Sequence, residues 1–186
     1  MIKAIFFDCF GVLMLTQQQT LEAQYPQHAE RLTELSHQAD AGFLVRDELT
    51  AQVAELLSIS KEESDKVLSD GYSANTDLVE YISELKKQGY KIGLISNLGQ
   101  GWFDTYVPES TKILFDDRVV SGEVGMVKPY PEIFELACTR LGVEPEDSVF
   151  VDDLISNCDG ARRAGLQPIL YESFEQFATD LQKLLK

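Results

Sequence analysis

The stretch "IKAIFFDCFGVLML" (residues 2–15) decides the fold of this chain. It opens with a short apolar run over residues 3–7, reaches a carboxylate at Asp8 and breaks at Gly11. Strands that read as continuous apolar runs are typical of parallel sheets, because helices cover both of their faces. We therefore expect a buried strand that delivers Asp8 to one edge of a sheet.

From Thr76 onward, strand-like and helix-like segments alternate. Apolar segments over 90–96, around 119–120, over 147–153 and over 166–173 are predicted as strands. Amphipathic segments over 77–89, 130–142, 156–165 and 174–186 are predicted as helices. This alternation predicts an α/β fold, a Rossmann-like parallel sheet with helices on both faces.

Residues 15–75 have a different character. Apolar residues recur there at steps of three and four, Ser60 with Glu63 forms a capping box, and the stretch carries no strand signal. We interpret 15–75 as a small all-helical cap domain inserted after the first strand of a core domain made of 1–14 and 76–186. Gly42, near the end of a predicted helix, suggests a bend or hinge there.

Composition limits the classes of function. The 186-residue chain carries a formal net charge of −15, which disfavours a nucleic-acid-binding surface. No apolar run is long enough to span a bilayer, and Asp8 interrupts the only candidate signal segment, so a membrane role is not expected. The three cysteines (Cys9, Cys138, Cys158) lack C-x-x-C spacing, which fits a reducing compartment, and we expect a cytoplasmic protein.

Polar residues gather where the predicted strands end. In open α/β sheets, ligands bind at the carboxyl ends of the strands. Asp8 ends the first strand, Ser96 and Asn97 end another, and Asp152 and Asp153 end a third. A lysine, Lys128, precedes a predicted helix in "GMVKPYPEIF". These groups should converge on one edge of the sheet and form a site.

Four segments resemble the motifs of one known family. "FFDCFGVL", "LISN", "GMVKPYPEIF" and "VFVDDLISNCDGARRAG" match, in order and spacing, the motifs of the haloacid dehalogenase-like (HAD) hydrolase superfamily. The helical insert after the first motif resembles the cap of the branch that holds small-molecule phosphatases and haloacid dehalogenases. The resemblance spans essentially the whole chain and implies a hydrolase, most simply a Mg²⁺-dependent phosphatase.

The resemblance assigns expected roles to the residues of the site. Asp8 would be the nucleophile that forms an aspartyl-phosphate. Ser96, with Asn97 beside it, would hold a phosphoryl oxygen, and Lys128 would offset the negative charge of the substrate. Mg²⁺ would be bound by Asp8, the backbone carbonyl of Phe10 and Asp153, with Asp152 acting through water. Asn157 would lie in an outer shell around the ion.

Phe10 departs from the pattern of the family. Phosphatases of this family typically carry a second Asp at that position, which protonates the leaving oxygen and later activates water. Three interpretations stay open: a phosphatase with another acid or slow turnover, a 2-haloacid dehalogenase-like enzyme, or a catalytically impaired protein that binds a phosphorylated ligand or a protein partner. The retained acid pair and Lys128 favour the first.

The expected substrate is a small phosphorylated metabolite, chosen by the cap. Five polar or aromatic residues of the predicted cap are candidates for that choice: Tyr25, His28, His37, Phe43 and Arg46. The sequence predicts neither the identity of the substrate nor the oligomeric state.

Overall fold

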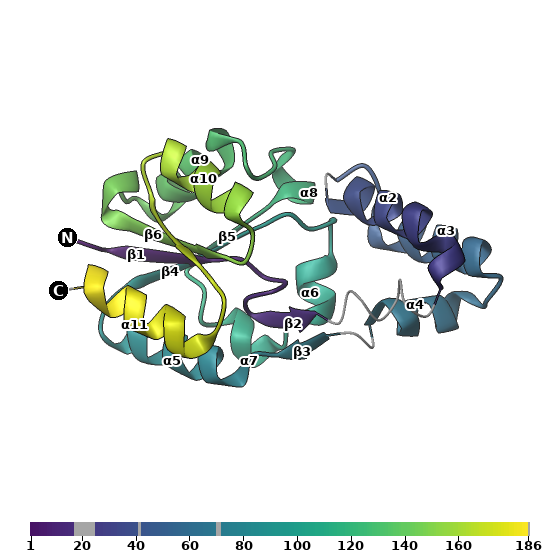
Figure 1. Cartoon of the computed structure of the whole chain (residues 1–186), viewed down its shortest axis with the longest axis horizontal. Helices are drawn as coiled ribbons and strands as arrows, with labels where there is room; N and C mark the ends of the chain where they lie inside the picture. The colour runs from purple at the N-terminus through teal and green to yellow at the C-terminus, as the bar shows by residue number, and fades with distance from the viewer. Residues whose placement is uncertain (17–24, 41, 70–71, 186) are drawn as a thin grey trace.

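The protein is described by a computed structural model that covers residues 1–16, 25–40, 42–69 and 72–185. Figure 1 shows a central sheet between two layers of helices, with a second group of helices extending from one end. Both chain termini lie at the end away from that group. The predicted α/β architecture is confirmed.

The strands of the main sheet are β1 (Ala4–Phe7), β4 (Lys91–Ser96), β5 (Asp117–Val120), β6 (Ser148–Asp152) and β7 (Gln167–Leu170). The helices around it are α5 (Thr76–Lys87), α6 (Trp102–Tyr106), α7 (Glu109–Lys112), α8 (Ser121–Val124), α9 (Pro131–Leu141), α10 (Ile155–Arg163) and α11 (Phe174–Leu184), with a 3-10 turn at Pro145–Asp147. The intervening segment contains β2 (Met14–Thr16), a 3-10 turn at Pro26–His28, α2 (Ala29–Asp40), α3 (Arg46–Leu57), α4 (Lys61–Ser69) and β3 (Tyr72–Ala74).

The main sheet is parallel throughout, with the strand order β5-β4-β1-β6-β7. The first strand of the chain is therefore the central one. Its last residue, Phe7, pairs with Leu94 of β4 on one side and with Val151 of β6 on the other. This register brings the residues that follow all three strands to the same edge of the sheet.

Both faces of the sheet are buried, which explains the continuous apolar run of β1. Ile5 and Phe7 belong to the core under α5 and α11, where the rings of Phe7 and Phe177 meet edge to face at 5.9 Å. Phe6 points the other way, into a second core under α9 and α10. Each fully buried aromatic ring contributes about 1.5–3 kcal/mol through the area it removes from water.

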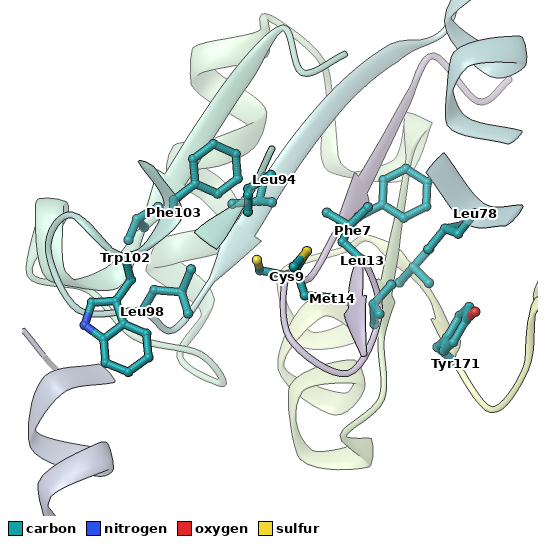
Figure 2. Packing of buried hydrophobic residues seen from close by; sticks show 14 of the residues in the cluster. Phe7, Cys9, Leu13, Met14, Leu78, Leu94, Leu98, Trp102, Phe103 and Tyr171 are labelled. Atoms are coloured by element: carbon teal, nitrogen blue, oxygen red, sulfur yellow. The ribbon is translucent and has the colours of Figure 1, made fainter. Parts of the chain in front are cut away.

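The loop after β1 is packed into the larger core. Leu13 and Met14 donate their backbone N–H groups to the carbonyl oxygen of Cys9, each at 2.8 Å, which closes a tight turn. Figure 2 shows Cys9 and Met14 between Leu78 on one side and Trp102 on the other. The turn that follows Asp8 is therefore held by backbone hydrogen bonds and by packing against the core.

A short antiparallel ladder joins the core to the helices of the insert. β2 pairs with β3, so that Met14 lies opposite Ala74. The sequence did not predict these strands, because three residues are too few to establish a periodicity. The predicted capping box is confirmed: Ser60 N–H donates to Glu63 Oε2 at 2.9 Å, and Glu63 N–H donates to Ser60 Oγ at 3.1 Å.

Helices α2, α3 and α4 form the group that extends beyond the sheet in Figure 1. Gly42, between α2 and α3, has a φ of +80°, and a Cβ there would lie 2.8 Å from the Cα of Gly122 in α8. A side chain would therefore separate the insert from the core at this contact. Gly42 thus lies at the turn between α2 and α3 and at one of the contacts between the insert and α8.

The sequence predicted no segment that spans a bilayer and no C-x-x-C pair of cysteines. Among the described helices, none has the length and apolar character needed to cross a membrane. The three cysteines are free thiols and buried.

Candidate active site

Asp8 lies just past the end of β1 and is 7% exposed. Its Oδ1 accepts hydrogen bonds from the hydroxyl of Ser96 at 2.6 Å and from the backbone N–H of Cys9 at 2.7 Å. Burial raises the pKa of Asp8 to about 6; the charge of Asp152 adds to this effect, whereas Lys128 and Ser96 oppose it. Asp8 is thus oriented by fixed donors.

Lys128 is the buried cation of the site. Its Nζ lies 2.8 Å from Asp8 Oδ1 and 2.6 Å from Asp152 Oδ2, and its side chain is 1% exposed. Burial alone would lower the pKa of Lys128, but the charges of Asp8 and Asp152 outweigh it and raise the pKa above its usual value. Lys128 therefore stays protonated and joins the ends of two neighbouring strands.

Asn97 fixes the backbone of Lys128. The side-chain amide of Asn97 donates to the carbonyl of Lys128 at 3.0 Å, and the N–H of Lys128 donates to Asn97 Oδ1 at 2.8 Å. Both ends of the amide are thus engaged with one peptide. Binding of phosphate by Asn97 stays a prediction, and what the structure shows is a clamp that positions Lys128.

Asp152 is fully buried, and both of its oxygens have partners. Oδ2 accepts from Lys128, and Oδ1 accepts from the N–H of Leu154 at 2.8 Å. The amide of Asn157 donates to both oxygens, at 3.0 and 3.1 Å. Asn157 therefore touches Asp152, consistent with an outer-shell position, and Asp152 itself is an anchor for the lysine.

Asp153 lies against the turn that follows Asp8. Gly11 has a φ of +87°, and a Cβ on it would lie 2.2 Å from Asp153 Oδ2. Only glycine leaves room for this carboxylate and adopts this backbone conformation without strain. Burial, and then the charge of Asp152, raise the pKa of Asp153.

Asp8, Asp152 and Asp153 together make an oxygen cluster. Each offers a carboxylate oxygen, and these oxygens all lie within 4.8 Å of one another. Three carboxylates face a single ammonium group, so the cluster carries excess negative charge that a cation would neutralise. An all-oxygen donor set suits a hard divalent ion such as Mg²⁺. The residues present therefore fit the predicted metal.

Phe10 turns toward aromatic rings of α6. Its ring meets those of Trp102 and Tyr106 at 6.2 Å each, at angles of 84° and 65°. The guanidinium of Arg46, at the first turn of α3, lies 5.0 Å from the centroid of Trp102 and 4.7 Å from that of Tyr106. We call Phe10, Trp102, Tyr106 and Arg46 the aromatic–arginine cluster. It joins the loop after β1 to the insert.

Comparison with known proteins decides the family. The model of the haloacid dehalogenase-like hydrolases matches residues 2–165 of the 186 in the chain.

The chain belongs to the haloacid dehalogenase-like hydrolases.

Relatives of this HAD-like hydrolase include phosphatases by name. It is 36% identical to the glyceraldehyde 3-phosphate phosphatase of Methanopyrus kandleri, over 48% of this chain and 40% of that protein. It is 29% identical to the phosphatase-named protein YhcW of Bacillus subtilis, over 91% of this chain and 83% of that protein. The match thus spans less than half of the Methanopyrus kandleri protein and most of the Bacillus subtilis protein.

A solved HAD family enzyme from Bacteroides thetaiotaomicron, in complex with magnesium and inorganic phosphate, shares the fold. Its TM-score is 0.78 and its sequence identity 22%, and the match covers 95% of this chain and 99% of that one. This likeness supports the predicted Rossmann-like architecture.

The structure brings most of the predicted site residues of the HAD-like hydrolase together. Asp8, Ser96, Lys128 and Asp152 are connected by direct contacts, with Asn157 behind Asp152. Their functional roles stay predictions. Of the five cap candidates, Arg46 reaches the core, Phe43 is 80% exposed, and the side chain of His37 lies outside the described residues.

Sequence reasoning missed two features of the site. The only sign in the sequence of the close approach between Gly11 and Asp153 was a glycine three residues after Asp8. The aromatic–arginine cluster joins residues 10, 46, 102 and 106, which no local pattern connects.

Proposed function

We propose that this chain is a Mg²⁺-dependent phosphatase that hydrolyses small phosphorylated metabolites through an aspartyl-phosphate on Asp8. The observation that carries the proposal is a cluster of three carboxylates, each with an oxygen within 4.8 Å of the others, in which Asp8 and Asp152 share the buried ammonium of Lys128. Phosphoryl transfer needs little beyond positioning and charge stabilisation, and these residues supply both. The phosphatase names among the relatives support the same activity.

Asp8, Asp153 and the backbone carbonyl of Phe10 would hold Mg²⁺, with Asp152 behind them. The ion would neutralise charge on the phosphoryl oxygens and help to align them with the nucleophile. Gly11 supports this assignment because it keeps the space around the carboxylate of Asp153 free.

The chemical step follows from the contacts of Asp8. One carboxylate oxygen is engaged by Ser96, Cys9 N–H and Lys128, which fixes the carboxyl group and leaves the other oxygen to attack phosphorus. The new Asp8–phosphorus bond forms as the bond to the leaving oxygen breaks. The protonated Lys128 beside Asp8 would reduce the repulsion between that carboxylate and the anionic substrate.

We further propose that residues 15–75 act as a separate cap domain over a core made of 1–14 and 76–186. The strands of the sheet run from the end that holds the chain termini toward α2, α3 and α4, so the insert faces the edge where Asp8 lies. Gly42 against Gly122 and Arg46 against Trp102 supply contacts between the two parts. Substrate choice by the cap would follow from this position.

A direct test compares hydrolysis of an aryl phosphate by the wild type and by Asp8→Asn, with Mg²⁺ and with EDTA. We expect Mg²⁺-dependent release of phosphate and a loss of more than about 10³-fold in Asp8→Asn, because that variant loses the nucleophile. A thermal unfolding curve of the variant in the same buffer checks that it is folded. Activity that survives in folded Asp8→Asn would overturn the assignment.

Phe10 favours a second candidate, a protein that binds a phosphorylated ligand or a protein partner without turnover. The aromatic ring can neither donate a proton nor activate water, and its contacts with Trp102 and Tyr106 hold it in the aromatic–arginine cluster. Calorimetric binding of orthovanadate in the presence of Mg²⁺, without hydrolysis of any phosphate ester, would select this candidate. Release of halide from a 2-haloacid without metal would instead select dehalogenase chemistry.

A further inference from the structure

We propose, on the basis of the function proposed above, that the leaving group departs as an unprotonated anion and that the substrates are therefore phosphoanhydrides, acyl phosphates or aryl and enol phosphates. In all of these the phosphoryl group is bonded to a weakly basic oxygen. Alkyl phosphates, whose alkoxide leaving groups are strongly basic, would be poor substrates. The inference names the substrate class of the same site.

The first support is the chemistry of the side chains around Phe10. The residue two positions after the nucleophile has its ring against Trp102 and Tyr106, at 6.2 Å in both cases. Phenylalanine and tryptophan have no titratable proton at physiological pH. Of these three rings, only that of Tyr106 carries a hydroxyl that could act as an acid.

The second support is that the carboxylates of the site are already assigned. Asp8 is the proposed nucleophile, and both oxygens of Asp152 accept hydrogen bonds from Lys128, Asn157 and a backbone N–H. Asp153 lies against the turn at Gly11 and belongs to the oxygen cluster that fits a metal. Each of these three carboxylates is therefore already engaged by direct contacts or by its place in the oxygen cluster.

The third support is a permanent positive charge supplied from the insert. The guanidinium of Arg46 stacks over the rings of Trp102 and Tyr106, and Asp65 of α4 holds one of its nitrogens. The Arg46 side chain is 13% exposed. Arginine does not give up its proton in proteins, so it is not an acid. It stacks on the same two rings that Phe10 contacts, so a departing anion on the Phe10 side of the site would be stabilised by this charge.

The step balances without a proton from the enzyme. An Asp8 carboxylate oxygen forms a bond to phosphorus, and the bond between phosphorus and the leaving oxygen breaks, with its electron pair staying on that oxygen. Water then attacks phosphorus, the Asp8–phosphorus bond breaks, and the electron pair returns to Asp8. The proton of the water passes to the released phosphate or to solvent. Only a stable anion can leave at a useful rate in the first step.

The test is a series of substituted phenyl phosphates whose leaving phenols have pKa values from about 4 to about 10. When no acid protonates the leaving oxygen, the logarithm of kcat/KM falls steeply as the phenol becomes more basic. An enzyme with a general acid shows a nearly flat dependence. We expect the steep dependence for the wild type in the presence of Mg²⁺.

Two substitutions at one position sharpen the result. Phe10→Asp introduces a carboxyl group that can carry a proton, whereas Phe10→Asn has nearly the same size and cannot. We expect Phe10→Asp to raise the rate for the most basic phenol relative to Phe10→Asn by about 10²-fold or more. If neither variant folds, the slope of the wild type still decides the inference.

A matched pair tests the role of Arg46. Arg46→Met should make log kcat/KM fall more steeply with the pKa of the leaving phenol, because the departing anion loses its positive neighbour. Arg46→Lys should restore part of the wild-type slope. Arg31→Met removes a charge from α2 whose side chain is 45% exposed, and it should leave the slope unchanged. If Arg46 only stabilised the fold, Arg46→Met would lower kcat/KM by the same factor for every phenyl phosphate.

Several outcomes would overturn the inference. A flat dependence in the wild type would mean that the enzyme supplies a proton, and a flat dependence that becomes steep in Tyr106→Phe would identify the donor. Either result refutes the inference and leaves the proposed phosphatase intact. Absence of turnover for every phenyl phosphate, including the most acidic phenol, would refute the proposed function itself.

Discussion

Replacement of Lys128 by methionine tests the electrostatics of the site. The substitution keeps a long side chain but removes the ammonium that lies 2.8 Å from Asp8 and 2.6 Å from Asp152, in a position only 1% exposed. Two buried carboxylates then lose their common cation. Breaking a buried ion pair from one side costs about 3–5 kcal/mol, because the remaining charge stays buried without compensation. For a chain of this length that corresponds to a fall in Tm of roughly 10 °C.

The loss should depend on pH in a defined direction. A carboxyl group whose pKa is higher in the folded than in the unfolded state binds more protons when folded, so it destabilises the fold as pH rises. Asp8, with its pKa already raised to about 6, would be raised further without Lys128. The destabilisation should therefore be larger at pH 8 than at pH 5. Mg²⁺ should reduce it by supplying a replacement cation.

The assay is urea unfolding followed by circular dichroism at both pH values, with Mg²⁺ and with EDTA. Lys86→Met is the matched control, since Lys86 also pairs with a carboxylate, Asp116 at 2.8 Å, but its side chain is 34% exposed. An exposed pair of this kind contributes about 1 kcal/mol or less. Equal losses in the two variants, or a loss at Lys128 that does not change with pH, would refute this account of the buried charges.

The remaining predictions concern the metal position and the nucleophile. Gly11→Ala should weaken the stabilisation by Mg²⁺ that thermal unfolding measures, because the new Cβ would displace Asp153. Gly89→Ala is the control, because Gly89 has a φ of +94° and no atom lies within 4 Å of its Cβ position. It carries the same backbone strain of about 1–2 kcal/mol and should keep the Mg²⁺ response. Ser96→Ala should move the acidic limb of the kcat/KM profile to higher pH, because the hydroxyl of Ser96 lowers the pKa of Asp8; an unmoved limb would argue against that contact.

The sequence was sufficient to predict the sheet and the edge at which the candidate site lies. Buried parallel strands leave an unmistakable apolar run, and a polar residue at the end of such a run has few structural explanations. Asp8, Ser96 and Asp152 could therefore be placed at one edge before their contacts were known. The sequence did not give the order of the strands. In the structure β1 lies between β4 and β6, which brings the residues at the ends of these three strands close together.

The features that the sequence did not predict depend on tertiary docking. β3 is three residues long and pairs with a strand that lies far away in the sequence, so neither its length nor its pattern marks it. The local sequence around Arg46, at the start of α3, is that of an ordinary charged helix. Only the packing of the insert against α6 places Arg46 over Trp102 and Tyr106. The amide of Asn97 is likewise directed by the loop that carries Lys128.

The most direct test of the central claim is the mass of the intact protein after acid quenching during turnover of an activated aryl phosphate with Mg²⁺. Because Phe10 cannot activate water for the second step, the phosphorylated enzyme should accumulate. The account predicts an added mass of one phosphoryl group, mapped by peptide analysis to Asp8 and absent from Asp8→Asn. Turnover without any adduct, or an adduct on another residue, would contradict it.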